Sequence, residues 1–102
     1  MQFEIKNVTR SQNDLMRVIG YRPAFFQNES EVSIIRPIGG KDYPRFHLYI
    51  KAIFEEQGAY SFNLHLDQKK PSYQGSTGHS GEYDGPLLVE EAGRIKNLLN
   101  NA

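Results

Sequence analysis

Two runs of alternating side chains, residues 45–54 and 60–67, constrain the fold of this 102-residue chain more than any other feature. In both runs the even positions are apolar and the odd positions are mostly polar, which is typical of strands with one buried side. A slip of one residue in their pairing would bury the polar set, so the pattern fixes which side chains share a face. The predicted core positions are Phe46, Leu48, Ile50, Ala52, Phe54, Tyr60, Phe62, Leu64 and Leu66.

The connection between the two runs sets the register of the predicted hairpin. A three-residue loop, Glu56-Gln57-Gly58, fits if the glycine adopts the left-handed conformation. Residues directly opposite each other would then have Cβ atoms ~4.5–5.5 Å apart. This register predicts three pairs on the polar face: His47 with Asp67, Tyr49 with His65, and Lys51 with Asn63.

Two segments have the apolar spacing and the terminal residues of helices. Residues 9–20 predict a short helix, with Ser11 as its N-cap and Gly20 just beyond its end. Asp84-Gly85-Pro86 is typical of a helix start, because proline is tolerated in the first turn. The apolar stripe of this second helix is Leu88, Ala92, Ile95 and Leu99.

Shorter segments predict the remaining strands. Residues 2–8 and 31–36 alternate like half-buried strands. Residues 21–26 predict an edge strand, because Pro23 lacks the N–H group that a central strand requires. A two-residue turn after this strand would pair Phe25 with Val32. The whole pattern predicts one α+β domain, residues 1–102, with a single antiparallel sheet of four to five strands. Both helices would pack on its apolar face, leaving the other face largely open.

Composition narrows the class of protein further. The chain has no cysteine, which excludes a disulfide framework, a cysteine-based zinc site and a thiol nucleophile. Twelve basic and twelve acidic residues give a formal net charge of zero, so we expect no global attraction to nucleic acid or to an anionic membrane. No apolar run approaches the roughly 20 residues of a membrane span, and the N-terminus does not resemble a signal peptide. These features favour a soluble, cytoplasmic protein with no membrane partner.

The three histidines, His47, His65 and His79, all fall within residues 45–82. His65 and Asp67 point to the same side of a strand, and the glycine-rich loop 69–85 could fold back towards them. Imidazoles and carboxylates suit zinc, iron(II) or manganese, although the spacing matches no closed zinc signature. The candidate ligands of a divalent metal, the one cofactor that we consider, are His65, Asp67, His79 and Glu82. The alternative is that they are ordinary solvent-facing strand and loop residues.

A second interpretation is a small phosphoester hydrolase, either metal-assisted or using two histidines as general acid and base. In the latter, His47 and His65 would act with Lys51. His47-Leu48-Tyr49 and His65-Leu66-Asp67 resemble the paired His-x-Thr/Ser strands of two-histidine phosphoesterases, with Tyr49 and Asp67 standing at the hydroxyl positions. The alternative is a hydrated face with a His47–Asp67 hydrogen bond. A nucleophilic serine beside His79 has no orienting acid in the sequence.

The leading interpretation is a non-enzymatic binding or interaction domain that uses the polar face of hairpin 45–67 and loop 69–85. Cations beside flat rings could stack unpaired bases of single-stranded nucleic acid, or contact a protein or a small molecule. Exposed Ile35 and Ile53 beside Tyr49 could instead mark a homodimer interface. The candidate binding residues are His47, Tyr49, Lys51, Asn63, His65, Asp67, Lys69, Tyr73, His79 and Glu82.

The phrases HLDQKKPSY and HSGEYDG are the most distinctive in the chain. Together with PRFHLYI they resemble a group of short bacterial proteins with no assigned activity, over roughly residues 43–98. This resemblance implies a bacterial cytosolic setting. It assigns no role to any residue.

Overall fold

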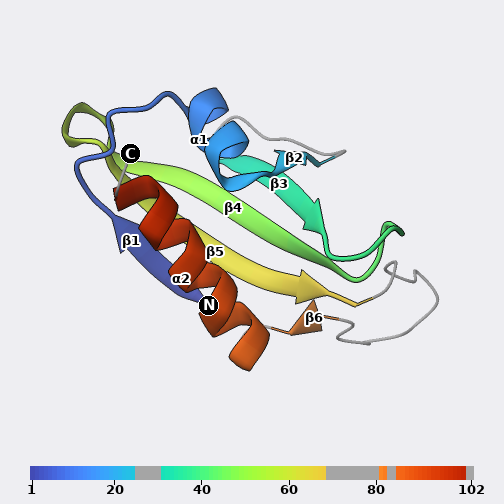
Figure 1. Cartoon of the computed structure of the whole chain (residues 1–102). Helices are drawn as coiled ribbons and strands as arrows, with labels where there is room; N and C mark the ends of the chain where they lie inside the picture. The colour runs from blue at the N-terminus through green and yellow to red at the C-terminus, as the bar shows by residue number, and fades with distance from the viewer. Residues whose placement is uncertain (25–30, 69–80, 83–84, 101–102) are drawn as a thin grey trace.

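The computed structural model of the chain describes residues 1–24, 31–68, 81–82 and 85–100 (Figure 1). Its elements are β1 (Gln2–Ile5), α1 (Gln12–Ile19), β2 (Arg22–Pro23), β3 (Val32–Pro37), β4 (Arg45–Phe54), the 3₁₀ turn η1 (Glu55–Gln57), β5 (Ala59–Asp67), β6 (Gly81–Glu82) and α2 (Pro86–Asn100). All strand pairs are antiparallel, in the order β1-β5-β4-β3-β2. The two-residue β6 follows β1 along the outer edge of β5. The predicted α+β fold with one antiparallel sheet and two helices is confirmed.

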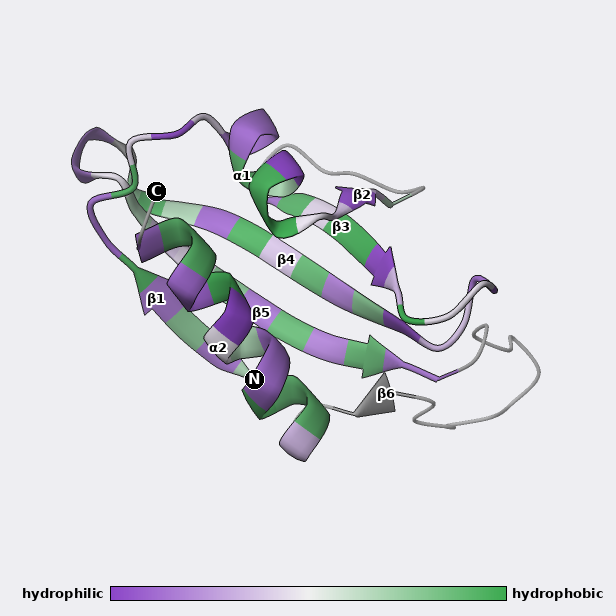
Figure 2. Ribbon diagram, viewed as in Figure 1, coloured by the Kyte–Doolittle hydropathy of each residue, from purple (hydrophilic) through white to green (hydrophobic). Residues whose placement is uncertain are grey.

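The alternation predicted for the central hairpin is present along both strands. Figure 2 shows it as successive green and purple bands on β4 and β5. The even-numbered side chains of residues 46–52 and 60–66 form one core with the inward stripes of both helices, so α1 and α2 lie on the same face of the sheet (Figure 1). The prediction of Phe54 as a core residue is wrong, because Phe54 is 62% exposed. The largest fully buried core residues are Phe62, Leu15, Ile19, Ile34, Leu48, Ile50, Leu64, Leu88 and Ile95.

The helix ends follow the predicted capping residues. The hydroxyl of Ser11 accepts a hydrogen bond from the Asp14 amide at 3.2 Å. Gly20 ends α1 in the left-handed conformation, with φ of 81°, and its N–H group donates to the carbonyl of Arg17. Helix α2 begins at Pro86, as predicted from the proline. Each cap satisfies a backbone group that the helix itself leaves unpaired.

The register of the β4–β5 hairpin differs from the prediction by two residues, although residues 45–52 and 60–67 lie on their predicted faces. The observed partner of His47 is His65, that of Tyr49 is Asn63, and that of Lys51 is Ser61. The loop is one residue longer than predicted, because η1 and Gly58 together connect Phe54 to Ala59. A bulge between Ala52 and Phe54 adds a second position. Two shifts of one residue restore the parity, so the side chains of residues 45–52 and 60–67 remain on their predicted faces. Phe54 lies beyond the bulge, opposite Ala59, and is exposed instead of buried.

The connection from β1 to α1 packs against this hairpin turn. Gly58 has φ of 64°, as predicted, and its carbonyl accepts a hydrogen bond from the Val8 amide at 3.1 Å. A Cβ atom at Gly58 would collide with the backbone of Val8. Glycine is therefore required here both for its backbone conformation and for this close approach.

Strand β2 lies at the edge of the sheet, as Pro23 predicted. The predicted pairing of Phe25 with Val32 lies outside the described residues. Ile35, predicted to be exposed, is in fact buried at 6% exposure, whereas Ile53 is exposed. Ile35 has neighbours on both sides in the sheet, Arg22 on β2 and His47 on β4, so it cannot contribute to an exposed apolar patch.

A buried carboxylate joins α2 to the rest of the core. Glu91 is 4% exposed, and the Tyr21 hydroxyl donates to its Oε2 at 2.6 Å. Nε and Nη2 of Arg94 donate to its two oxygens at 2.7 and 2.8 Å, and Nη2 also donates to the Ile19 carbonyl at the end of α1. Burial and the hydrogen bond to Glu91 raise the pKa of the Tyr21 phenol far above its usual value.

Neither described helix is both long and apolar enough to cross a membrane.

Candidate functional site

Six side chains on the face of the sheet away from the helices form what we call the polar cluster. Its members are Ser33 on β3, Arg45, His47 and Tyr49 on β4, and His65 and Asp67 on β5. They share this face because odd-numbered residues of the three strands pair with one another. Observed pairing sets His47 opposite His65, Arg45 opposite Asp67, and Ser33 opposite Tyr49.

The carboxylate of Asp67 lies at the centre of the polar cluster. Its Oδ2 is 3.1 Å from Nδ1 of His47 and 3.2 Å from Nε of Arg45. Its Oδ1 is 3.0 Å from Nε2 of His65. Three side chains with N–H groups therefore surround one carboxylate, and all of them come from β4 and β5.

The hydrogen bonds to Asp67 determine its protonation state. Burial by itself would raise the pKa of the Asp67 carboxyl, because it disfavours the charged form. The hydrogen bonds from His47 and His65 outweigh this effect and hold the pKa well below its usual range. Asp67 is therefore an anion throughout the neutral range and is available as a ligand or as a hydrogen-bond acceptor.

His47 joins Asp67 to β3. Its Nε2 shares a hydrogen bond of 2.7 Å with Oγ of Ser33, while its Nδ1 faces Asp67. The order serine, imidazole, carboxylate is that of a hydrolytic triad. Ser33, however, is 7% exposed and lies inside a strand paired on both sides, where its backbone belongs to the sheet. The arrangement therefore holds the His47 ring in place, and it does not offer Ser33 to a substrate as an exposed nucleophile.

Three aromatic rings of the cluster pack on one another. The His47 and Tyr49 ring centroids are 4.5 Å apart and stacked, and the His47 and His65 centroids are 4.8 Å apart. Tyr49 and His65 lie at 5.5 Å. These contacts restrict the rotation of both imidazoles.

Three members of the cluster can act together as metal ligands. One ligand atom from each of His47, His65 and Asp67 can be chosen so that all three lie within 4.8 Å of one another. Two imidazole nitrogens and one carboxylate oxygen are a donor set used for zinc and for non-haem iron.

The sequence predicted part of this site. The structure brings together His65 and Asp67, as predicted for a metal, but the third neighbour that it shows is His47. His79, Lys69 and Tyr73 lie outside the described residues. The backbone of Glu82 pairs with core residue Leu66, and that of Gly81 with Asp67. Among the predicted binding residues, Lys51 is exposed on the same face, and Asn63 lies opposite Tyr49.

Sequence reasoning missed Ser33. The available signal was the alternation of β3, in which Ser33 stands between Val32 and Ile34 and so belongs to the polar face. Its position beside His47 required the β3–β4 register, which the sequence did not supply.

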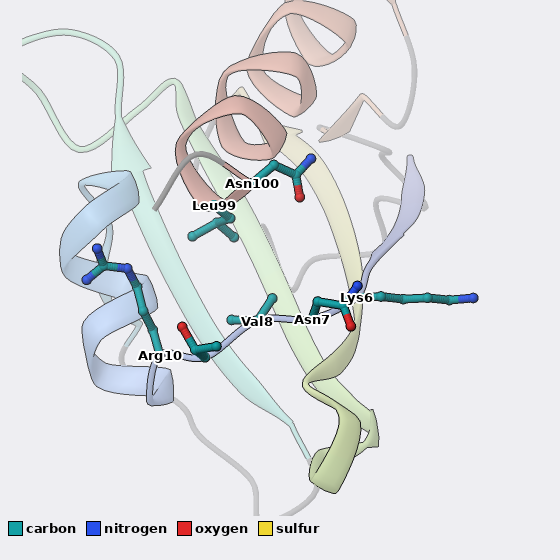
Figure 3. Close-up of a pocket in the computed structure, with 7 residues that line it drawn as sticks. Lys6, Asn7, Val8, Arg10, Leu99 and Asn100 are labelled. Carbon is teal, nitrogen blue, oxygen red and sulfur yellow. The ribbon is translucent and has the colours of Figure 1, made fainter.

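A separate cavity of about 200 Å³ lies between residues 6–10 and the end of α2. Figure 3 shows that its two cationic side chains diverge, with Arg10 extending alongside α1 and Lys6 extending to the other side. Val8 and Leu99 occupy the space between them (Figure 3). Because its polar groups do not converge, this cavity is a weaker candidate than the polar cluster.

No protein-family model matches the chain, and no curated protein or solved structure is significantly similar to it.

Proposed function

We propose that this chain is a small binding domain that holds an ion or a small polar ligand at the polar cluster. The observation that supports this function is the setting of Asp67, whose carboxylate contacts Arg45, His47 and His65. The hydrophobic core lies on the opposite face of the sheet, so the packing of the helices does not require this arrangement.

A merely hydrated sheet face is the simplest alternative. Side chains on such a face are normally well exposed, but those of Arg45, His47, His65 and Asp67 are only 12–20% exposed. Recessing a carboxylate costs free energy unless hydrogen bonds compensate it, and here three partners do so. A recessed, fully partnered carboxylate with a strongly shifted pKa is typical of a functional site.

The shape of the polar cluster favours a small ligand over a nucleic-acid strand. Base stacking needs ring faces that are open to solvent. In this cluster the rings of His47, Tyr49 and His65 cover one another. An ion or a compact polar molecule needs no open ring face, only access to Asp67, whose side chain is 16% exposed.

The same geometry gives little support to the two-histidine hydrolase. In that mechanism two imidazoles flank a phosphoryl group, each about 3 Å from a reacting oxygen. His47 and His65 have centroids 4.8 Å apart and share one carboxylate, so a phosphoryl group does not fit between them. A metal-assisted hydrolase would need an ion at this site first.

Native mass spectrometry of the full chain, purified without a histidine tag or chelator, tests the proposal without assuming a ligand. We expect a discrete mass excess that disappears on denaturation. His65→Ala should abolish this excess, whereas Val89→Ala, at a 60% exposed position on α2, should leave it intact.

An NMR titration of the same protein detects binding of ligands that the protein loses during purification. Zinc, inorganic phosphate, citrate and adenosine monophosphate serve as probes, and we expect at least one to shift the amide resonances of residues 45–49 and 63–67. If no mass excess is found and no probe shifts these resonances, the proposed function is wrong.

A further inference from the structure

We propose that the ligand of the polar cluster is a divalent transition metal ion, with Zn²⁺ the best match, bound by His47 Nδ1, His65 Nε2 and a carboxylate oxygen of Asp67. The inference rests on the proposed function, since it names the ligand of the same site.

The spacing of the three ligand atoms suits one ion. A tetrahedral zinc ion with bonds of about 2.0–2.1 Å places neighbouring ligand atoms about 3.3 Å apart. His47 Nδ1 lies 3.1 Å from Asp67 Oδ2, and His65 Nε2 lies 3.0 Å from Asp67 Oδ1. One ligand atom from each of the three residues lies within 4.8 Å of the other two. Small rotations about side-chain bonds would therefore admit an ion in place of these two hydrogen bonds.

The surroundings of the ligands match those of metal-binding histidines and carboxylates in general. A ligating imidazole usually donates its other N–H group to an oxygen, which fixes the ring. Oγ of Ser33, 2.7 Å from His47 Nε2, can accept that hydrogen bond when Nδ1 binds the metal. Arg45 Nε, 3.2 Å from Oδ2, orients the carboxylate of Asp67 in the same way.

The donor set decides which class of metal fits. Imidazole nitrogen favours zinc, cobalt(II), nickel(II) and copper(II), whereas magnesium and calcium require mostly oxygen ligands. The charge of Arg45 opposes the binding of any cation, so an ion held by charge alone would gain little here. Binding must therefore come from the two imidazoles, which selects a transition metal.

The ligands also lie on a rigid part of the fold. His47 is in β4 and His65 and Asp67 are in β5, two strands that pair along most of their lengths. Because little backbone has to be ordered on binding, the site is pre-organised. Three protein ligands leave a coordination position for water or for an anion, towards which both the ion and Arg45 would contribute positive charge.

Metal titrations of the untagged, metal-stripped full chain test the inference. We expect isothermal titration calorimetry to show saturable binding of one Zn²⁺ per chain and no binding of Mg²⁺. Co²⁺ should develop the visible absorption of a low-coordinate site. His47→Ala and His65→Ala should each weaken Zn²⁺ binding by at least about tenfold. Val89→Ala, at a 60% exposed position on α2 outside the polar cluster, should not change it.

A measurement on the wild-type chain tests the same ligands without relying on variants, which could fail to fold. In ¹⁵N NMR spectra of the imidazoles, Zn²⁺ should shift Nδ1 of His47 and Nε2 of His65. Absence of Zn²⁺ binding, or Zn²⁺ binding that leaves both nitrogens unshifted, would overturn the metal assignment. If Zn²⁺ does not bind but the native mass excess still depends on His65, the proposed binding function is retained and the ligand is not Zn²⁺. If Zn²⁺ binding and the mass excess are both absent and no other probe shifts the resonances of residues 45–49 and 63–67, both proposals are wrong.

Discussion

At the scale of single residues, two carboxylates on opposite faces of the sheet have different tasks. Glu91 is buried in the core and receives hydrogen bonds from Tyr21 and Arg94, so it joins α2 to the segment that follows α1. Asp67 lies on the other face, where its partners are Arg45 and two imidazoles. Removing one member of either group would leave a recessed polar atom unpaired, which costs about 1–3 kcal/mol.

The Tyr21–Glu91 hydrogen bond predicts a specific dependence of stability on alkaline pH. The pKa of Tyr21 is raised in the folded chain, so above pH of about 10 the unfolded chain loses a proton that the folded chain keeps. The free energy of unfolding contributed by Tyr21 should therefore fall by about 1.4 kcal/mol per pH unit above that point. Tyr21→Phe should be less stable than wild type at pH 7 by about 1 kcal/mol. This difference should shrink above pH 10.

Urea denaturation of both chains between pH 7 and pH 11 measures this effect. All other titrating groups are common to the two chains and cancel in the comparison. A difference in unfolding free energy that stays constant across this range would show that Tyr21 ionises equally easily in both states.

A second prediction at this scale concerns Ser33, a positioning residue for His47. If Ser33 Oγ orients the imidazole for a metal, Ser33→Ala should weaken Zn²⁺ binding by about 10–100-fold. Ser33→Thr keeps the hydroxyl and should recover part of the affinity. Calorimetry of the two variants checks this, and equal affinities in Ser33→Ala and wild type would contradict it.

At the scale of elements, the turn between β4 and β5 organises the site. The turn contains η1 and Gly58, and the bulge beside it sets the pairing of His47 with His65. Val8, far away in the sequence, bonds to Gly58 and packs against it. The turn that sets the register of the polar cluster is therefore in direct contact with the β1–α1 connection.

Two glycine substitutions separate backbone strain from this close approach. Gly20 and Gly58 both have positive φ, but a Cβ atom at Gly20 meets no atom within 4 Å, whereas one at Gly58 meets the Val8 backbone. Gly20→Ala should cost about 1 kcal/mol for the left-handed conformation alone. Gly58→Ala should cost clearly more, because the turn must also move. Guanidinium denaturation gives both values, and similar losses would mean that the Val8 contact is unimportant.

At the scale of the whole molecule, the two faces of the sheet have different roles. The helices and the even-numbered residues of β4 and β5, except Phe54, form the core on one face. The polar cluster occupies the other. The two sets of side chains point to opposite sides of the same strands. A substitution in the core can therefore change the stability without replacing any residue of the candidate site.

A core substitution tests which face of the sheet provides the stability. Phe62 is fully buried and stacks on Phe3 with ring centroids 5.2 Å apart. Phe62→Ala should lower the free energy of unfolding by about 3–5 kcal/mol, a large part of the roughly 5–15 kcal/mol of a typical domain. Val89→Ala, at an exposed position on α2, should change it by no more than about 0.5 kcal/mol. Thermal and urea unfolding of both variants measure these values, and equal losses would contradict the assigned core.

Several features of this protein could be derived from sequence because their causes are local. The caps of α1 depend on Ser11 and Gly20, residues within the helix ends themselves. Away from the bulge, the face of each residue on β4 and β5 depends only on whether its position is odd or even, because side chains of a strand alternate. The fold class, most of the core and the common face of His47, His65 and Asp67 follow from these local rules, whereas the exposure of Phe54 follows from the bulge.

The partners within the polar cluster were decided by the tertiary structure. An alternating pattern is unchanged by a shift of two residues, so it could not tell whether His47 faces Asp67 or His65. The longer turn and the bulge set the register in which His47 pairs with His65. This turn is the one in which Gly58 contacts Val8. Pairing with β3 then brought Ser33 to His47. Local chemistry therefore determined which residues share the face, and contacts between segments distant in sequence determined which of them meet.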